Sequence, residues 1–221
     1  MSFSPKWDAA YQRKEHQSVW PWSNLVSRCL RHTAIKDCDP SFRVLELGCG
    51  AGANIPFFLE YGVDYYGIEG SQAAVESLQA RFPQLRGKLA AGDFTESLVF
   101  DGPFDLVVDR ASITHNDTAA IRHCLSMIEA SLGDDGVFVG CDWYSTESTR
   151  YREGAQGVDP FTCGDIAEGT FAGIGQVHFS SYEHIQDLFD HFKIISLDHI
   201  AERVYVGSGE GNATWQIVAA K

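Results

Sequence analysis

The stretch that decides the fold is Phe42-Arg43-Val44-Leu45-Glu46-Leu47-Gly48-Cys49-Gly50-Ala51-Gly52. Its first half is an apolar run typical of a buried strand, and it stops at three glycines that alternate with other residues. A candidate helix follows over residues 55–61. Glycines at such a point let the chain turn sharply and let a ligand approach backbone N–H groups closely. The stretch therefore predicts a strand, a ligand-binding loop and a helix.

Strand-like and helix-like runs alternate downstream of this loop. Apolar runs at residues 65–69, 89–93, 104–109 and 136–142 are typical of strands, and residues 72–82 and 118–132 carry apolar side chains at helical spacing. This alternation predicts an α/β fold, a doubly wound sheet of parallel strands joined by right-handed crossovers. Ligands of such sheets bind at the carboxyl ends of the strands.

The end of the chain has a different pattern. Residues 181–192 are predicted to be helical, and two strand-like runs follow at 193–206 and 214–220, joined by a turn-rich linker. Because no helix separates these two runs, we expect them to pair antiparallel. The chain is then one domain over 1–221, with segments 1–40, 41–143, 144–180 and 181–221.

Composition narrows the class of protein and its partners. The chain has 221 residues, 44% hydrophobic and 12% aromatic, so it can bury a core and is not mainly disordered. The net charge of −13 argues against binding to nucleic acid or to an anionic membrane, and favours a small-molecule partner. No apolar run is long enough to span a bilayer, and the first residues lack the core of a signal peptide, so a cytoplasmic location is expected. The six cysteines form no CxxC pair, and no metal site is predicted.

Three acidic positions at predicted strand ends could hold a ligand. Glu46 lies at the tip of the first strand, where a carboxylate suits an ammonium group. Glu69 ends the second strand and could accept both ribose hydroxyl protons. Asp93 could accept from an adenine amine, with Phe94 against the ring. The glycine pattern alone fits either a dinucleotide or an adenosine joined to an amino acid.

Four segments together resemble class I S-adenosylmethionine-dependent methyltransferases: VLELGCGAGANIPFF, YYGIEGS, AGDF and FDLVVDRASITHN. The resemblance covers roughly residues 40–142 and implies a Rossmann-like, mostly parallel seven-stranded sheet with an antiparallel C-terminal strand. It also implies S-adenosyl-L-methionine as the cofactor. The expected cofactor-binding residues are Glu46, Gly48, Gly50, Gly52, Glu69, Gly70, Asp93, Phe94 and Asp109.

The loop after the fourth predicted strand, Asp109 to Asn116, is where this family places groups that face the methyl donor and acceptor. His115 could act as a general base there, because a histidine titrates near pH ~6.5. Asp109 is the second expected catalytic residue. Arg110 and His115 have the spacing of the Arg and His in phosphoethanolamine N-methyltransferases, but Ala111 replaces an acidic residue of that family. The alternative is that His115 is a polar neighbour of the cofactor without a role in proton transfer.

Two segments could contact the acceptor. By resemblance, residues 1–40 form a lid, in which Tyr11 and Trp20 either touch the acceptor or pack against the sheet. Residues 144–180 are an unusually long insertion after the fifth strand, and we expect them to cap the acceptor. The remaining expected acceptor-binding residues are Arg110, Tyr144, Arg150, Arg152 and His178. The arginines would suit an acidic or phosphorylated acceptor, or are solvated surface residues.

The predicted function is methyl transfer to an oxygen or nitrogen of a small molecule. Two alternatives use the same glycine loop. One is a non-catalytic protein that binds S-adenosylmethionine or S-adenosylhomocysteine. The other is an NAD-dependent oxidoreductase, which the lack of a Tyr-x-x-x-Lys motif disfavours. Methylation of a protein or nucleic acid is disfavoured by the charge and by the absence of an NPPY-like motif.

Overall fold

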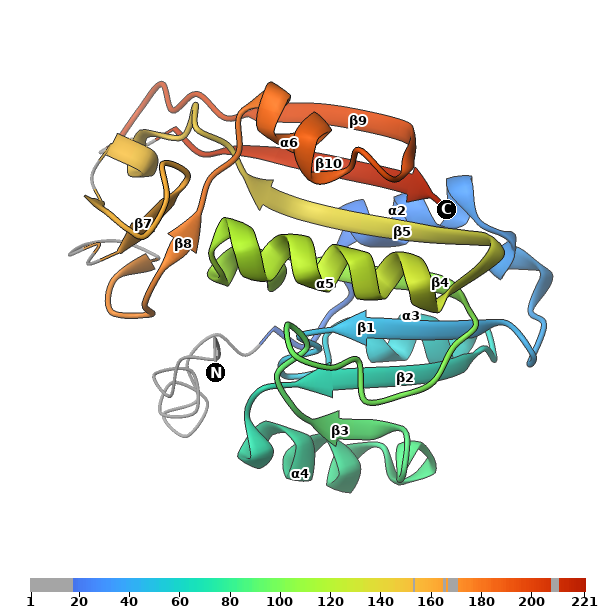
Figure 1. The fold of residues 1–221 in the computed structure, drawn as a ribbon. Helices are drawn as coiled ribbons and strands as arrows, with labels where there is room; N and C mark the ends of the chain where they lie inside the picture. Colours follow the sequence, from blue (N-terminus) through green and yellow to red (C-terminus); the bar gives the residue numbers. More distant parts are fainter. Residues whose placement is uncertain (1–17, 153, 165, 167–170, 208–210) are drawn as a thin grey trace.

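A seven-stranded sheet in the order β3-β2-β1-β4-β5-β10-β9 forms the centre of the computed structural model (Figure 1). The structure describes residues 18–221 except 153, 165, 167–170 and 208–210. Strands β1 to β5 pair in parallel, and β10 pairs antiparallel with both β5 and β9. The predicted α/β, mostly parallel sheet with an antiparallel C-terminal strand is therefore confirmed. The strands are β1 (Arg43–Leu47), β2 (Asp64–Glu69), β3 (Leu89–Ala91), β4 (Phe104–Arg110), β5 (Leu132–Tyr144), β9 (Lys193–Ala201) and β10 (Ala213–Ala220).

Helices connect these strands, and several begin at side chains that cap them. Ser71 accepts a hydrogen bond from the N–H of Ala74, and Asp117 accepts one from Ala120. Such caps satisfy backbone donors of the first turn. The helices are α2 (Ser23–His32), α3 (Ile55–Glu60), α4 (Gln72–Arg81), α5 (Thr118–Ser131) and α6 (Tyr182–Leu188). Short 3-10 turns are η1 (Ala34–Asp37), η2 (Pro83–Leu85), η3 (Ile113–His115) and η4 (Thr149–Arg152).

The ends of four elements differ from the predicted ones. The third strand ends at Ala91 rather than at residue 93, because Asp93 turns back to accept from the N–H and hydroxyl of Thr95. The fifth strand is longer than predicted and begins directly after α5. The last helix ends at Leu188, and β9 ends at Ala201 instead of residue 206.

The core lies on both faces of the sheet because successive strand residues point to opposite sides. Val44 of β1 packs with residues of α2, α3 and α4, whereas its neighbour Leu45 packs with residues of α5 and α6. The largest fully buried side chains include Trp143 of β5 and Tyr65 of β2. Both faces of the sheet are thus covered, as a parallel sheet requires.

The insertion (residues 144–180) forms a small antiparallel sheet of β6 (Ala155–Gln156), β7 (Thr162–Gly164) and β8 (Val177–His178). It has its own apolar cluster, and Tyr144 at the end of β5 packs against that cluster. In Figure 1 the insertion lies beyond the carboxyl end of β5, the edge toward which β1 and β2 also point. The cluster consists of Cys163, Ile166, Phe171, Ile174, Val177 and Phe179.

The described residues lack two kinds of feature. None of their helices has the length and apolarity to cross a membrane. Nor do they bring three or more His, Cys, Asp or Glu side chains together as a metal ion would require.

Candidate active site

The glycine loop after β1 is built from left-handed backbone. Gly48, Gly50 and Gly52 have φ angles of +62°, +55° and +77°, a region that glycine enters at little cost. A Cβ on Gly48 would overlap Oγ of Ser112, in the loop after β4. A Cβ on Gly52 would lie 2.5 Å from a methyl carbon of Leu78 in α4. The glycines therefore let the loop pass close to two neighbouring elements.

Gly48→Ala should destabilise the fold more than Gly62→Ala. Gly62 also has a left-handed φ, +67°, but a Cβ at that position would have no atom within 4 Å. We expect Gly62→Ala to cost about 1 kcal/mol for its backbone conformation alone. Gly48→Ala should cost roughly 1–3 kcal/mol more, because of the contact with Ser112. Urea unfolding of both variants measures the difference, and equal losses would show that the close approach to Ser112 is unimportant.

Glu69, at the end of β2, connects the glycine loop to the start of α4. Its carboxylate accepts from the N–H of Gly50 at 2.9 Å and from the N–H of Ser71 at 3.0 Å. The side chain is only 4% exposed. Gly70 lies between Glu69 and Ser71 at the same strand end. The predicted ribose-binding carboxylate is thus positioned by two backbone donors.

Glu46 lies within β1, and its carboxylate is buried beneath the same loop. It accepts from Nδ2 of Asn54 at 2.8 Å and from the hydroxyl of Tyr65 at 2.6 Å. Burial raises the pKa of Glu46 to about 7, although both hydrogen bonds lower it. Asn54 precedes α3 but does not cap it; its Oδ1 instead accepts from the N–H of Trp22 at 3.1 Å. Sequence reasoning missed Asn54 and Tyr65, because neither belongs to a recognisable motif.

The raised pKa of Glu46 predicts a dependence of stability on pH. Between the unfolded pKa near 4.5 and the folded pKa of about 7, the folded chain holds a proton that the unfolded chain has lost. This stabilisation is complete below the unfolded pKa and is lost as the pH rises through 7. We therefore expect the free energy of unfolding to fall between pH 5 and pH 8, and less steeply in Glu46→Gln. Urea unfolding at several pH values measures both slopes, and identical slopes would contradict the assignment.

Asp93 and Phe94 follow β3, and the ring of Phe94 lies beside the glycine loop. Asp93 shapes its own turn through the two bonds to Thr95. An edge carbon of the Phe94 ring would be 3.6 Å from a Cβ on Gly48, so the ring lies against the loop. The structure therefore brings Phe94, which we expect to contact the adenine ring, next to Gly48 of the glycine loop.

Asp109 supports the loop after β4 from beneath. It is 0% exposed and accepts from the N–H groups of Ser112 and Ile113, both at 3.0 Å, and from Nε1 of Trp143 at 2.7 Å. Burial raises its pKa to about 7. The expectation that Asp109 contacts the cofactor or takes part in the chemistry is corrected here, because its carboxylate is enclosed by the loop that it shapes.

His115 closes the short turn η3 of that loop. Its Nδ1 lies 3.4 Å from the carbonyl oxygen of Gln176 in the insertion. Its ring also meets the ring of Tyr144 edge-on, with centroids 6.0 Å apart. The insertion and the loop after β4 thus come together at the predicted base.

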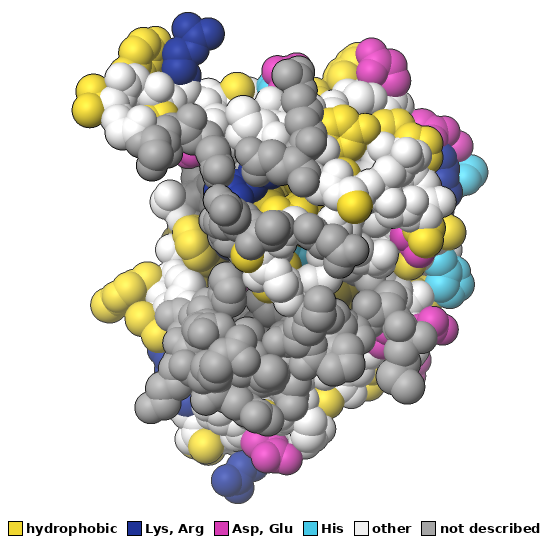
Figure 2. All heavy atoms as spheres, turned by 90° about the vertical axis from the view of Figure 1, so that its left-hand side faces the viewer, with side chains coloured by type: hydrophobic (Ala, Val, Ile, Leu, Met, Phe, Trp, Pro, Cys, Tyr) yellow, Lys and Arg dark blue, Asp and Glu magenta, His cyan; other side chains and the backbone are white. Residues whose placement is uncertain are grey.

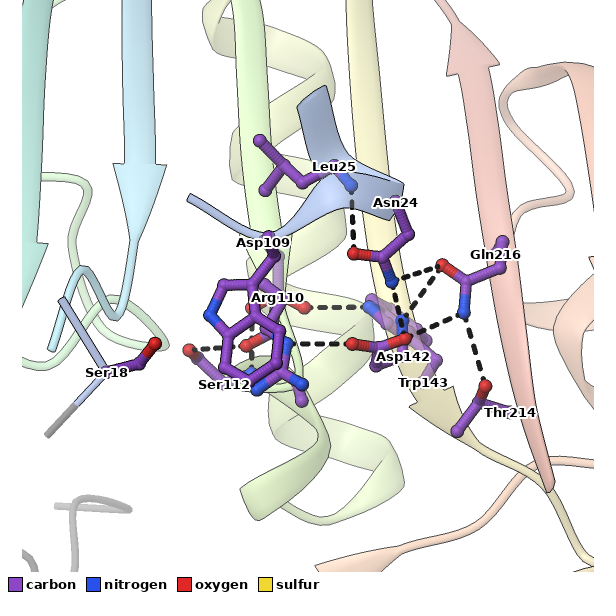
Figure 3. Close-up of polar contacts among 12 residues, drawn as sticks. Ser18, Asn24, Leu25, Asp109, Arg110, Ser112, Asp142, Trp143, Thr214 and Gln216 are labelled. Carbon is purple, nitrogen blue, oxygen red and sulfur yellow. Dashed lines mark hydrogen bonds and ion pairs between the residues drawn. The ribbon is translucent and has the colours of Figure 1, made fainter. Parts of the chain in front are cut away.

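Arg110 belongs to a polar group that the sequence did not reveal. Its guanidinium lies 3.6 Å from the ring centroid of Trp22, and its Nε is 2.7 Å from Oδ2 of Asp142 (Figure 3). Asn24 and Gln216 bond to the other oxygen of Asp142. These partners come from α2, β5 and β10, and no spacing pattern relates them.

The other predicted acceptor residues are placed differently. Trp20 is 79% exposed, so packing against the sheet, one alternative for it, is wrong. Arg150 lies over the ring of Phe171, 5.7 Å from its centroid. Arg152 ends η4 within the insertion. Tyr11 lies outside the described residues.

The expectation that His178 contacts the methyl acceptor is wrong, because its side chain is buried and packs within the protein. It is 0% exposed on β8, with Nδ1 3.2 Å from Oγ1 of Thr162 and Nε2 3.2 Å from Nε2 of His184 in α6. Burial, together with His184, lowers its pKa to about 3, so the ring is neutral. The pair instead fastens the insertion to α6.

Figure 2 looks onto the edge of the molecule formed by the carboxyl ends of the parallel strands. The described acidic side chains lie mostly around its rim, and hydrophobic and basic atoms are visible nearer the centre.

Comparison with known proteins identifies the kind of domain to which this edge belongs. Residues 44–136 match a family described as a methyltransferase domain. By this match, residues 44–136 form a methyltransferase domain. The matched residues run from β1 into β5 and include the glycine loop, Glu69, Asp93 and the loop with His115.

Relatives and similar structures agree with this fold. The ribosomal RNA small subunit methyltransferase A of Parabacteroides distasonis is 36% identical over 74 residues, which are 32% of this chain and 28% of that protein. An S-adenosylmethionine-dependent methyltransferase from Clostridium acetobutylicum superimposes with a TM-score of 0.58 at 17% identity, covering 96% of this chain and 95% of that one. The geranyl diphosphate C-methyltransferase of Streptomyces coelicolor, solved with S-adenosyl-L-homocysteine, gives 0.61 at 15% identity, with coverages of 88% and 78%.

The residues of the methyltransferase domain suit S-adenosylmethionine. Gly48 and Gly52 leave no room for a Cβ, which keeps the loop backbone open to close approach. Glu69 is a carboxylate at a strand end, where it could accept from ribose hydroxyls. Glu46 lies beneath the loop, with its two oxygens bonded to Asn54 and Tyr65. The glycine loop and Glu69 together suit the adenosine part of S-adenosylmethionine.

Proposed function

We propose that the chain methylates an oxygen or nitrogen of a small-molecule acceptor, and that His115 removes the acceptor's proton. The observation that carries this proposal is the junction between His115 and the insertion. The loop after β4 reaches the insertion there through the contact of His115 Nδ1 with the carbonyl of Gln176. A base at a covered strand end is suited to an acceptor that is enclosed by the protein.

The contact with Gln176 selects one tautomer of His115. A backbone carbonyl can only accept, so Nδ1 carries the ring proton when this bond forms. The lone pair of the neutral ring then lies on Nε2. We assign Nε2 as the atom that accepts the proton of the acceptor.

The other residues of the site act by positioning. S-adenosylmethionine supplies an activated methyl group when it is bound. The bonds from Asp109 to the N–H groups of Ser112 and Ile113 fix the loop that carries His115. Tyr144 packs between His115 and Phe171, whose ring centroid is 4.6 Å away, and so supports the same position from the insertion. Orientation of this kind can account for most of the catalysis, because the donor is already reactive.

A small acceptor is supported by charge and by one structural neighbour. At a net charge of −13, a phosphate backbone would be repelled by the overall field of the chain. The geranyl diphosphate C-methyltransferase, which shares this fold, was solved with the small molecule geranyl diphosphate bound. The match to the ribosomal RNA methyltransferase covers 28% of that protein.

Transfer of a labelled methyl group tests the proposal. The full chain is incubated with methyl-labelled S-adenosylmethionine and a cell extract that has been separated into small molecules, protein and RNA. We expect label in the small-molecule fraction, and none with Glu69→Ala. Label in RNA or in protein, or no transfer to any fraction, would overturn the proposed acceptor class.

A further inference from the structure

Asp142, at the end of β5, is fixed by three other elements. Its Oδ1 accepts from Nδ2 of Asn24 at 2.7 Å and from Nε2 of Gln216 at 2.9 Å, and its Oδ2 accepts from Nε of Arg110 at 2.7 Å (Figure 3). The fully buried Gln216 also accepts from the backbone N–H of Asp142 at 3.3 Å. Both carboxylate oxygens of Asp142 therefore have partners, and the residue has one defined position.

Asp142 in turn fixes the guanidinium of Arg110. The Nε edge is bound to Asp142, and one face lies against the indole of Trp22 at 3.6 Å. Trp22 is held through its backbone N–H by Asn54. The long side chain of Arg110 is thus held at one edge and one face of its guanidinium.

The opposite edge of the guanidinium is open. The Arg110 side chain is 31% exposed. Within the described part of the chain, Nη1 and Nη2 of Arg110 make no hydrogen bond. Neither of these two nitrogens is buried. Two N–H donors therefore face solvent from a fixed support at the end of β4, the strand that leads into the loop with His115.

The backbone at this point is strained directly after β4 and within the neighbouring β5. Ala111 and Asp142 have φ angles of +56° and +57°, which residues other than glycine seldom adopt. The two strands pair here, with Arg110 opposite Cys141. Strain of this kind costs roughly 1–3 kcal/mol per residue and is concentrated at functional sites.

We infer that Nη1 and Nη2 of Arg110 bind a carboxylate of the methyl acceptor, and that Asp142 is the residue that positions Arg110 for it. The planar fork of an arginine matches the two oxygens of a carboxylate in a bidentate contact. The negative charge of Asp142 offsets that of the guanidinium, which disfavours a dianionic phosphate beside it. This inference rests on the proposed function and names the class of its acceptor.

Fluorine NMR of small probes tests the inference without knowledge of the acceptor. The full chain is saturated with S-adenosylhomocysteine and titrated with 4-fluorobenzoate, 4-fluorobenzamide and 4-fluorophenyl phosphate. We expect the benzoate to bind most tightly of the three. Arg110→Lys, which keeps the charge but loses the fork, should weaken its binding about tenfold. Asp142→Asn should weaken it severalfold, whereas Arg86→Lys, at an exposed arginine elsewhere, should leave it unchanged.

The outcomes separate this inference from the proposed function. Affinity for S-adenosylhomocysteine, measured on every variant, shows that each is folded. Benzoate binding that is equal in the parent and Arg110→Lys, or absent from both, overturns the carboxylate site while the methyltransferase assignment stands. Tighter binding of the phenyl phosphate overturns the choice of a carboxylate. Transfer of the labelled methyl group to RNA or protein would overturn the proposed function instead, whatever the probes do.

Discussion

Glu69→Ala should weaken the binding of S-adenosylhomocysteine by about 100-fold or more. The carboxylate is placed to accept from ribose hydroxyls, and each hydrogen bond to a charged group is worth roughly 1.5–3 kcal/mol, so the loss of two exceeds the ~2.7 kcal/mol of a 100-fold change. The substitution also leaves the N–H groups of Gly50 and Ser71 without their acceptor. Calorimetric titration of the full chain measures the change.

Glu76→Ala is the matched control for this prediction. Glu76 is an exposed residue of α4 that accepts from Gln72, and it lies near Glu69 in the sequence. Its removal should leave the affinity unchanged. Thermal unfolding without ligand must show that Glu69→Ala is folded. A folded Glu69→Ala variant that binds S-adenosylhomocysteine like the parent would remove Glu69 from the cofactor site.

The parts of the fold that the sequence predicts are those with strong local signals. β1 is an apolar run that ends at glycines, and α4 begins at a capping serine and ends just before Pro83. Patterns of this kind depend on neighbouring residues only. The carboxylates Glu46 and Glu69 were also predictable, because a strand end places them at the ligand edge of a parallel sheet.

The residues that the sequence could not predict are joined by tertiary contacts over long separations. Asn24 and Asp142 are 118 residues apart, and Asn24 and Gln216 are 192 apart. None of them lies in a motif, so only the pairing of β5 with β10 and the docking of α2 bring them to Arg110. The same limit explains Asp109 and His178. Each looked reactive by residue type, but burial gives Asp109 a role in the loop and His178 a role in attaching the insertion.

His115→Ala should lower kcat by about 10²–10⁴-fold, the usual contribution of a general base, while the affinity for S-adenosylhomocysteine changes less than about twofold. The reason is that Nε2 of His115 acts on the acceptor proton in our proposal, and no contact of the ring is needed to hold the cofactor. With the parent, kcat should fall toward acid pH as the ring becomes protonated. The variant should lose this dependence. Steady-state kinetics with an acceptor found by the labelling experiment measures both effects.

Rescue by added imidazole separates a base from a residue that only packs. Imidazole in solution can replace a missing base in the space that the removed ring leaves, but it cannot restore the contact that joins Gln176 to the loop. We therefore expect it to raise kcat of His115→Ala and to leave the parent unchanged. His123→Ala, at an exposed histidine of α5, is the matched control and should behave like the parent. If His115→Ala kept the pH profile of the parent and did not respond to imidazole, the acceptor would lose its proton to another group, and the proposed role of His115 would be wrong.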